Sequence, residues 1–268
     1  MAIGGGTGLP VVLSGLSATL DGLTDRPDSL TAIVTVMDDG GSSGQLRRGL
    51  GIIPPGDIRN CLAALAANDL PLASVLQHRF GEDSILGGHP VGNILLAALL
   101  ERTGSVESAV AELSRMLRLR GRVIPCSAAD VHLRAVLRDG RTIIGETAIV
   151  DARQPIERLE IVPQAQPIPD AIRALVNASV VVLGPGSLYT SVICNLLVTG
   201  IGATLSGLTA TRIYVANLMT QPGETDGYTV EDHLDAILRH VPGKPLDYVL
   251  VNTTSIPADV AEHYHQEG

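Results

Sequence analysis

A run of four glycines and one threonine, residues 4–8, stands between a short apolar segment and a predicted helix over residues 9–19. Residues without side chains let backbone N–H groups approach an anion, and a helix N-terminus adds the positive end of its dipole. The spacing is not G-x-G-x-x-G, because Leu9 takes the sixth position, and it is not a P-loop, because no Lys-Ser/Thr pair follows. The run predicts a phosphate cradle, with a turn made only for packing as the alternative.

Two adjacent carboxylates, Asp38 and Asp39, follow the next apolar segment and precede glycines and serines. In dinucleotide folds an acidic residue at this place holds a ribose hydroxyl, whereas paired carboxylates beside a phosphate suit Mg²⁺. A third carboxylate, Asp57, follows at a predicted helix start, where it is either a ligand or a cap. For Asp38 and Asp39 we predict a ribose contact or a Mg²⁺ site, with an acidic turn as the alternative.

Other polar residues accompany these loops. Arg47, Arg48 and Arg59 are the main cations nearby, and an arginine can grip a phosphate with two hydrogen bonds. His89 precedes a predicted helix and is either catalytic or structural, whereas Asn93 is a candidate for recognising a base or hydroxyl. No triad, nucleophile elbow or metal-spaced His/Cys set is present, so catalysis has only the candidates Asp39, Asp57 and His89.

Two later loops repeat the pattern. GPGS, residues 184–187, lies between an apolar segment and a helix and predicts a second anion or sugar contact, with Ser187 as a plain N-cap in the alternative. The polar loop 217–227 ends the next apolar segment and has the composition of a ligand loop or an ordinary surface loop. The predicted ligand contacts are Gly5, Gly6, Thr7, Gly8, Asp38, Asp39, Ser42, Ser43, Arg47, Asp57, Asn60, His89, Asn93, Gly184, Gly186, Ser187, Asn217 and Asp226.

Short β-branched segments alternate with helical ones along most of the chain. This order predicts one α/β domain over residues 1–268, Rossmann-like, with a mainly parallel doubly wound sheet, helices on both faces and ligands at the carboxyl ends of the strands. A hairpin signal at Asp139-Gly140 predicts a β-rich insertion over about 121–162. The short first strand and the chain's stop near a helix start predict that both termini are truncated. The predicted strands cover 31–37, 179–183, 212–217 and 247–252, and the predicted helices 9–19, 57–67, 72–79, 92–102, 105–119, 169–177, 188–198 and 229–241.

The composition limits the partners. The formal net charge is −9 and no long basic run is present, so neither nucleic acid nor an anionic membrane is expected to bind. No apolar run is long enough for a membrane span, and the N-terminus lacks the basic region and cleavage site of a secretory signal, so we predict a cytoplasmic protein. The three separated cysteines, Cys61, Cys126 and Cys194, are expected to be reduced core residues.

The segments IGGGTGL, VTVMDDGGSSGQLRRGLGIIPPGDIRNCLAALA, HPVGN, RGRVIP, LGPGSLYTS, NLLVTGI and ANLMTQPGETDGYTVEDHL resemble the YvcK-type gluconeogenesis factors, the UPF0052 group. More distantly they resemble the CofD phospholactate transferases. The resemblance implies a Rossmann-like fold that binds UDP-sugars such as UDP-N-acetylglucosamine or UDP-glucose, and a role in carbon allocation, cell-wall precursor supply and cell shape on gluconeogenic carbon sources. It places the diphosphate near residues 5–8, Ser187 and Arg47, and a divalent cation at Asp38, Asp39 and Asp57.

Two departures bear on this resemblance. Pro90, Val91, Ile94 and Leu95 stand where relatives usually have an aromatic pair, so a stacking role there is not expected. Leu188-Tyr189 replaces the Asn-Pro of the transferases.

Three functions follow in order of preference. The first is a UDP-sugar-binding regulator without turnover; the second is a metal-dependent transferase moving a phospholactyl or phosphoenolpyruvyl group from a nucleotide donor; the third is an NAD-dependent oxidoreductase. A homodimer is expected on general grounds, and the downstream partner is left open.

Overall fold

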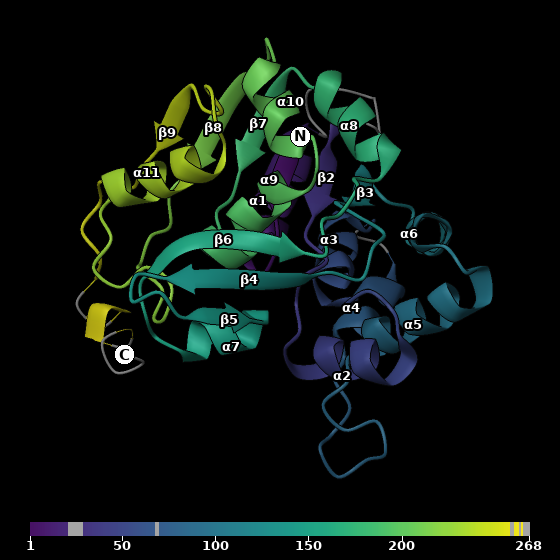
Figure 1. Cartoon of the computed structure of the whole chain (residues 1–268). Helices are drawn as coiled ribbons and strands as arrows, with labels where there is room; N and C mark the ends of the chain where they lie inside the picture. The colour runs from purple at the N-terminus through teal and green to yellow at the C-terminus, as the bar shows by residue number, and fades with distance from the viewer. Residues whose placement is uncertain (21–28, 68–69, 258–259, 263, 265–268) are drawn as a thin grey trace.

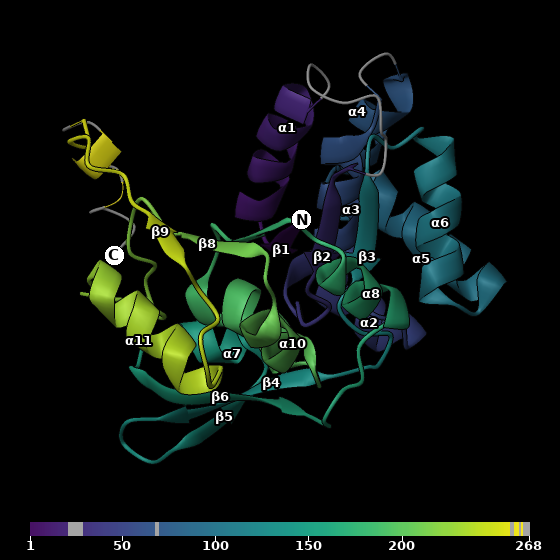
Figure 2. The ribbon, with the colours of Figure 1, turned by 90° about the horizontal axis from the view of Figure 1, so that it is seen from above.

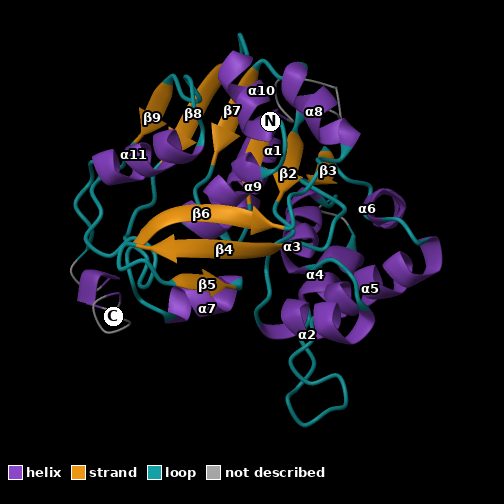
Figure 3. Ribbon diagram, in the orientation of Figure 1, coloured by secondary structure: helices purple, strands orange, loops and turns teal. Residues whose placement is uncertain are grey.

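The main body of the protein is a six-stranded parallel sheet, described here from a computed structural model of residues 1–20, 29–67, 70–257, 260–262 and 264. All five strand pairs are parallel (Figure 3), and the order along the chain runs outward from β1 to β3 on one side and from β7 to β9 on the other. This is the predicted α/β, Rossmann-like sheet, which is therefore confirmed. From edge to edge the strands are β3 (Arg122–Pro125), β2 (Thr31–Val34), β1 (Ala2–Gly4), β7 (Val180–Leu183), β8 (Thr211–Val215) and β9 (Tyr248–Leu250).

Helices lie on both sides of this sheet. Figures 1 and 2 show α8 (Pro169–Val176), α10 (Ile201–Gly207) and α11 (Val230–His240) on one side, and α1 (Gly8–Leu20) and α3 (Gly56–Leu65) on the other. α11 begins with the predicted capping box, in which Thr229 and Asp232 bond each other's backbone N–H groups. The other helices on the α3 side are α4 (Pro71–Gln77), α5 (Val91–Thr103) and α6 (Val106–Met116).

A second, antiparallel sheet has the order β5 (Thr142–Ile144), β4 (His132–Leu137) and β6 (Ile156–Val162). Its hairpin turns at the predicted place, where Gly140 has a φ of 86° and its N–H donates to the Leu137 carbonyl. The expected start of the insertion at 121 is corrected by β3, because residues 122–125 pair with β2 in the main sheet. The separate sheet begins only at His132.

Several helices were not predicted or differ from their prediction. Residues expected as a polar loop form α2 (Gly41–Leu50), although glycine and serine have low helix propensity, because its Ser43, Leu46 and Arg47 are buried against the body. The expected helix 188–198 is a π-helix, η2 (Leu188–Ile193), continued by α9 (Cys194–Leu197). Short helices α7 (Glu146–Asp151) and α10 were missed, and the helix expected near Pro257 lies partly outside the described residues.

The core is mainly aliphatic and includes the fully buried Tyr189 and Tyr214. All three cysteines are free and buried within it, as expected. Within the described residues no single helix has the length and apolar character for a membrane span, and the one helix pair that does, Leu188–Leu197 with Ile201–Gly207, is bent by 82°.

Candidate functional site

The predicted glycine loops meet at the carboxyl edge of the main sheet. β1 and β7 are neighbours, so the loops that follow them lie side by side. A Cβ added to Gly8 would stand 2.4 Å from the carbonyl oxygen of Pro185, and one added to Gly186 would stand 3.5 Å from that of Gly5. At Gly8 only glycine permits this approach of one backbone to the other. The two loops therefore form one backbone-walled site at the start of α1.

The second glycine loop is held by a side chain from β8's end. The Gly186 N–H donates to Asn217 Oδ1 at 3.1 Å, and Asn217 Nδ2 donates to the Gly186 carbonyl at 2.9 Å. Ser187 stands at the N-cap position of η2, but its side chain makes no capping hydrogen bond. The cap alternative for Ser187 thus has no support in the structure, whereas Asn217 has a clear role in fixing the loop.

Asp57 lies against the first glycine loop. A Cβ on Gly5 would stand 2.6 Å from Asp57 Oδ2, and the Gly6 backbone donates a hydrogen bond to the Asp57 carboxylate. Burial raises the pKa of Asp57 to about 6, a shift that the Gly6 bond opposes and nearby Asp38 increases. Asp57 is in the first turn of α3, after the N-cap residue Pro55, so it is not the cap itself.

Asp39 does not join Asp38 and Asp57. Its Oδ2 accepts from the Glu146 N–H at 2.9 Å, and its Oδ1 accepts from the Thr147 N–H at 2.9 Å and the Thr147 hydroxyl at 2.7 Å. These donors are at the start of α7, so Asp39 supplies the capping acceptor of that helix from a distant part of the chain. For Asp39 the structure therefore favours a structural role over that of a metal ligand.

Asp38 and Asp57 are the two carboxylates that fit a cation. Asp38 Oδ1 accepts from the Gly40 N–H at 2.9 Å, and Asp38 raises the pKa of Asp57 by charge repulsion. No set of three or more His, Cys, Asp or Glu side chains within the described residues is arranged for a metal. Mg²⁺ usually takes only one or two carboxylates together with substrate phosphates, so two carboxylates beside a phosphate site suffice for it.

Glu146 completes this acidic cluster and was not predicted. Burial, followed by the charges of Asp38 and Asp57, raises the pKa of Glu146 to about 9, and Glu146 Oε2 accepts a hydrogen bond from the Asp39 N–H at 3.4 Å. Glu146 lies in the predicted β-rich insertion, shortly after β5, where no site residue was expected. The Gly145-Glu146 pair after that strand, a glycine and an acid as at the other loop starts, was the available signal.

Ser42, His89 and Asn93 form a small network contributed by α2, the segment before α5, and α5. The Ser42 hydroxyl lies 2.7 Å from His89 Nδ1 and accepts from Asn93 Nδ2 at 3.0 Å. Asn93 Oδ1 is buried without a hydrogen-bond partner. The structure thus brings these three predicted residues together. The neighbouring Ser43 is different, because it is buried and accepts from the Gly56 N–H at 3.1 Å.

The Arg47 guanidinium is bonded to residues just before β4 and not to the glycine loops. It is buried and ion-paired with Asp130, and its Nη2 also donates to the Val131 carbonyl at 2.5 Å. A phosphate contact would depend on Nη1, which is buried without a hydrogen-bond partner. Asn60 likewise accepts from Arg59 Nη2 at 2.7 Å.

Of the remaining predicted residues, Thr7 and Gly184 lie in the two glycine loops, and Asp226 stabilises a neighbouring loop. Thr7 is exposed on the first glycine loop, and Gly184 has a φ of 72°. Asp226 is exposed, and its Oδ2 accepts from the Gly223 N–H at 2.8 Å, so it shapes its own loop.

Glu224, which was not predicted, anchors the same loop to η2. It is buried, and it accepts from the Tyr189 N–H at 3.1 Å and the Thr190 hydroxyl at 2.6 Å. Burial raises the pKa of Glu224 from its ordinary value. No sequence signal indicated this contact, because Glu224 is one charged residue in a polar loop and its partners are 34 and 35 residues away in the chain.

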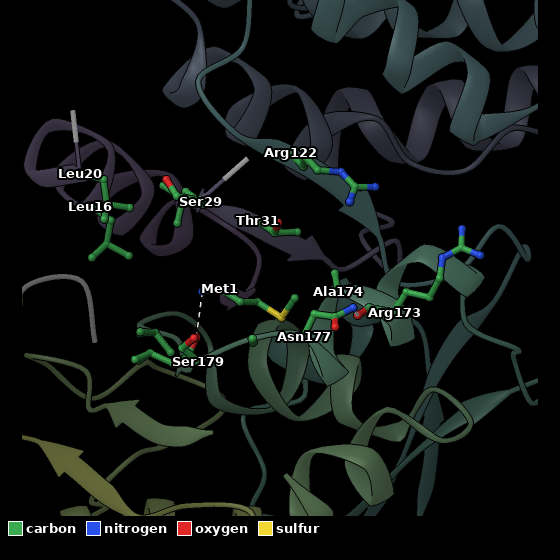
Figure 4. Close-up of a pocket in the computed structure, with 14 residues that line it drawn as sticks. Met1, Leu16, Leu20, Ser29, Thr31, Arg122, Arg173, Ala174, Asn177 and Ser179 are labelled. Carbon is green, nitrogen blue, oxygen red and sulfur yellow. Dashed lines mark hydrogen bonds between the residues drawn. The ribbon is translucent and has the colours of Figure 1, made fainter. Parts of the chain in front are cut away.

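A large cavity lies away from this site. About 950 Å³ in volume, it lies at the amino end of the strands, beside Met1, Thr31, Arg122 and Val180 (Figure 4). In an open parallel sheet ligands bind at the carboxyl ends of the strands, where the glycine loops and carboxylates are. We therefore take the glycine-loop edge as the functional site.

Comparison with known proteins decides the family. The profile of the 2-phospho-L-lactate transferase CofD family matches residues 1–268. The chain belongs to the CofD family. Within it, this CofD-family chain is 45% identical over 265 residues to the gluconeogenesis factor of Bacillus subtilis, a match covering 98% of this chain and 81% of that protein. The predicted resemblance to the gluconeogenesis factors is confirmed.

Two further relatives of this CofD-family chain agree. A putative gluconeogenesis factor of Nostoc is 47% identical over 269 residues, but the chain spans only 58% of its length. The crystal structure of a UPF0052 family member from Bacillus halodurans is 44% identical, with a TM-score of 0.93 over 99% of this chain and 84% of that one.

Proposed function

We propose that this gluconeogenesis-factor relative binds a UDP-sugar, such as UDP-N-acetylglucosamine or UDP-glucose, with the diphosphate at the two glycine loops. The close approach of Gly8 to the Pro185 carbonyl carries the proposal, because it brings two glycine loops at helix starts against each other, and such loops bind anions through backbone N–H groups. A protein with a net charge of −9 needs such a device to hold a diphosphate. The proposal includes a cytoplasmic homodimer that affects carbon allocation and cell shape without turning the ligand over.

Calorimetry with UDP-N-acetylglucosamine, with and without Mg²⁺, tests this proposal. We expect the Gly8→Ala variant to bind at least tenfold more weakly, because its Cβ would stand 2.4 Å from the Pro185 oxygen and force the loops apart. Gly15→Ala in the same helix is the matched control, since a Cβ there meets nothing within 4 Å, and it should bind normally. No binding by the unmodified protein under either condition would refute the proposal.

Mg²⁺ would be held by Asp38 and Asp57 and would neutralise the diphosphate between the loops. The expected result is that Asp38→Asn removes the gain in affinity that Mg²⁺ provides. Asp39→Asn serves as the control, because the Asp39 oxygens are already bonded to residues 146 and 147. Equal loss in both variants would contradict this assignment.

A metal-dependent transferase is the second candidate. It is favoured by the family of the chain and by the approach of Asp38, Asp57 and Glu146, whose repulsion a cation would relieve. Such a reaction depends on positioning and charge stabilisation more than on a nucleophile. Incubation with a nucleotide-linked phospholactyl or phosphoenolpyruvyl donor, a deazaflavin acceptor and Mg²⁺, followed by mass spectrometry, distinguishes this candidate from a binding protein without turnover. Only the transferase forms a product.

A further inference from the structure

One serine hydroxyl lies where the two glycine loops meet. A Cβ added to Gly6 would stand 3.3 Å from Ser191 Oγ. A Cβ added to Gly186 would stand 3.3 Å from Ser191 Cβ and 3.9 Å from Ser191 Oγ. Gly6 belongs to the first loop and Gly186 to the second, so the Ser191 side chain lies beside both. Ser191 is part of η2 and is not among the ligand contacts that the sequence predicted.

The Ser191 hydroxyl is buried without a hydrogen-bond partner among the described residues. Ser191 is only 4% exposed, and its bonds are those of its backbone. Its N–H donates to the Ser187 carbonyl at 2.9 Å, and its carbonyl accepts from Asn195 Nδ2 at 2.7 Å. Buried hydroxyls are normally hydrogen-bonded, so one without a protein partner indicates a partner outside the protein, such as a ligand, an ion or a water.

The π-helical turn of η2 holds this hydroxyl in place. The Val192 N–H donates at 3.0 Å to the Ser187 carbonyl, five residues back, which widens the turn by one residue. Asn195 Nδ2 donates to the Gly4 carbonyl at 3.0 Å as well as to the Ser191 carbonyl, so it ties η2 to the end of β1. Such π-turns occur frequently at functional sites. The turn and Asn195 together hold Ser191 against the first glycine loop.

We propose that the Ser191 hydroxyl donates a hydrogen bond to a phosphate oxygen of a diphosphate bound between the two glycine loops. This inference rests on the proposed function and adds a side-chain donor to the backbone N–H groups of the loops. A hydrogen bond from a hydroxyl to a phosphate oxygen is charge-assisted and stronger than a bond between neutral groups. Arg47, the arginine predicted to contact the diphosphate, is ion-paired with Asp130, which gives uncharged donors a larger share in holding the ligand.

Calorimetry with UDP-N-acetylglucosamine and with inorganic pyrophosphate, each with Mg²⁺, tests the contact. Ser191→Ala should weaken the binding of both ligands about tenfold or more, because a hydrogen bond to a charged group is lost. Ser17→Ala is the matched control, since Ser17 is a buried serine toward the far end of α1, and its affinities should be unchanged.

Thermal unfolding without ligand separates a ligand contact from a structural role. The melting temperature of Ser191→Ala should be unchanged or higher, because the hydroxyl that it removes has no partner in the protein. A serine with only a structural role would give the opposite pattern, a lower melting temperature and an unchanged affinity. Ser191→Cys, whose thiol is a weak donor, replaces Ser191→Ala if the alanine variant does not fold.

The two ligands distinguish failure of this contact from failure of the proposed function. If the unmodified protein binds the UDP-sugar and Ser191→Ala binds it equally well, the Ser191 contact is wrong and the proposed function stands. If the protein binds only pyrophosphate, and Ser191→Ala weakens that binding, the UDP-sugar assignment is wrong and the Ser191 contact stands. Binding of neither ligand overturns both.

Discussion

At the scale of single residues, the site combines carboxylates that repel one another with a backbone wall that attracts anions. Asp57 and Glu146 have raised pKa values of about 6 and about 9, in each case first through burial and then through neighbouring acids. Burying charge in this way costs folding stability, and proteins keep such arrangements mainly at functional sites. The cluster therefore supports a role in ligand binding more than in stability.

This arrangement predicts a pH dependence. The folded protein binds a proton at Glu146 more tightly than the unfolded chain does. The contribution of Glu146 to the free energy of unfolding is therefore least unfavourable below about pH 4.5 and becomes more unfavourable as the pH rises toward 9. Glu146→Gln should therefore raise the free energy of unfolding at pH 8 by about 1 kcal/mol or more and change it little at pH 4. Urea denaturation at the two pH values measures this, with the exposed Glu101→Gln as the control. A gain of equal size at both pH values would contradict the assignment.

At the scale of elements, distant segments hold one another in place through polar side chains. Asp39, after β2, bonds the start of α7, and Asn217, after β8, bonds the loop after β7. Glu224 ties the 217–227 loop to η2. The Asp39 and Glu224 contacts fix loops at the carboxyl edge to helices, and the Asn217 contact joins two of these loops, so the site residues are positioned by segments far from them in the sequence.

The Asp39 side chain should contribute to the stability of the fold. Asp39→Ala removes three acceptor contacts from the start of α7 and should lower the free energy of unfolding by about 1–2 kcal/mol, the usual cost of losing a cap. Chemical denaturation measures it. Asp39→Asn keeps one oxygen and should lose less. A stability unchanged by Asp39→Ala would show that the contact contributes nothing.

At the scale of the whole molecule, the strand order decides which loops can share a ligand. β2, β1, β7 and β8 are consecutive in the sheet, so the four loops that follow them lie along one edge although they span residues 5 to 227. The switch between β1 and β7 is the crevice where open α/β sheets bind ligands.

A ligand that binds only the folded state raises its stability by mass action. NAD, GDP, UDP and UDP-sugars at equal concentration should therefore rank in a thermal-shift assay with the UDP-sugars highest. Gly8→Ala should lose the shift and Gly15→Ala should keep it. A larger shift with NAD would favour the oxidoreductase alternative, and one with GDP would favour the transferase.

The sequence by itself determined the sheet class, the free buried cysteines, the hairpin at Asp139-Gly140 and the glycine loops, because each depends on local pattern: strand and helix periodicity, turn residues and glycine spacing. Only the tertiary structure decided that Asp39 caps α7, that Arg47 pairs with Asp130, that Glu146 joins Asp38 and Asp57, and that Ser42 meets His89. These contacts join residues between 47 and 108 positions apart. Whether a polar side chain caps, pairs or stays available for a ligand depends on what the fold brings beside it, and residue type and spacing along one chain do not contain that information.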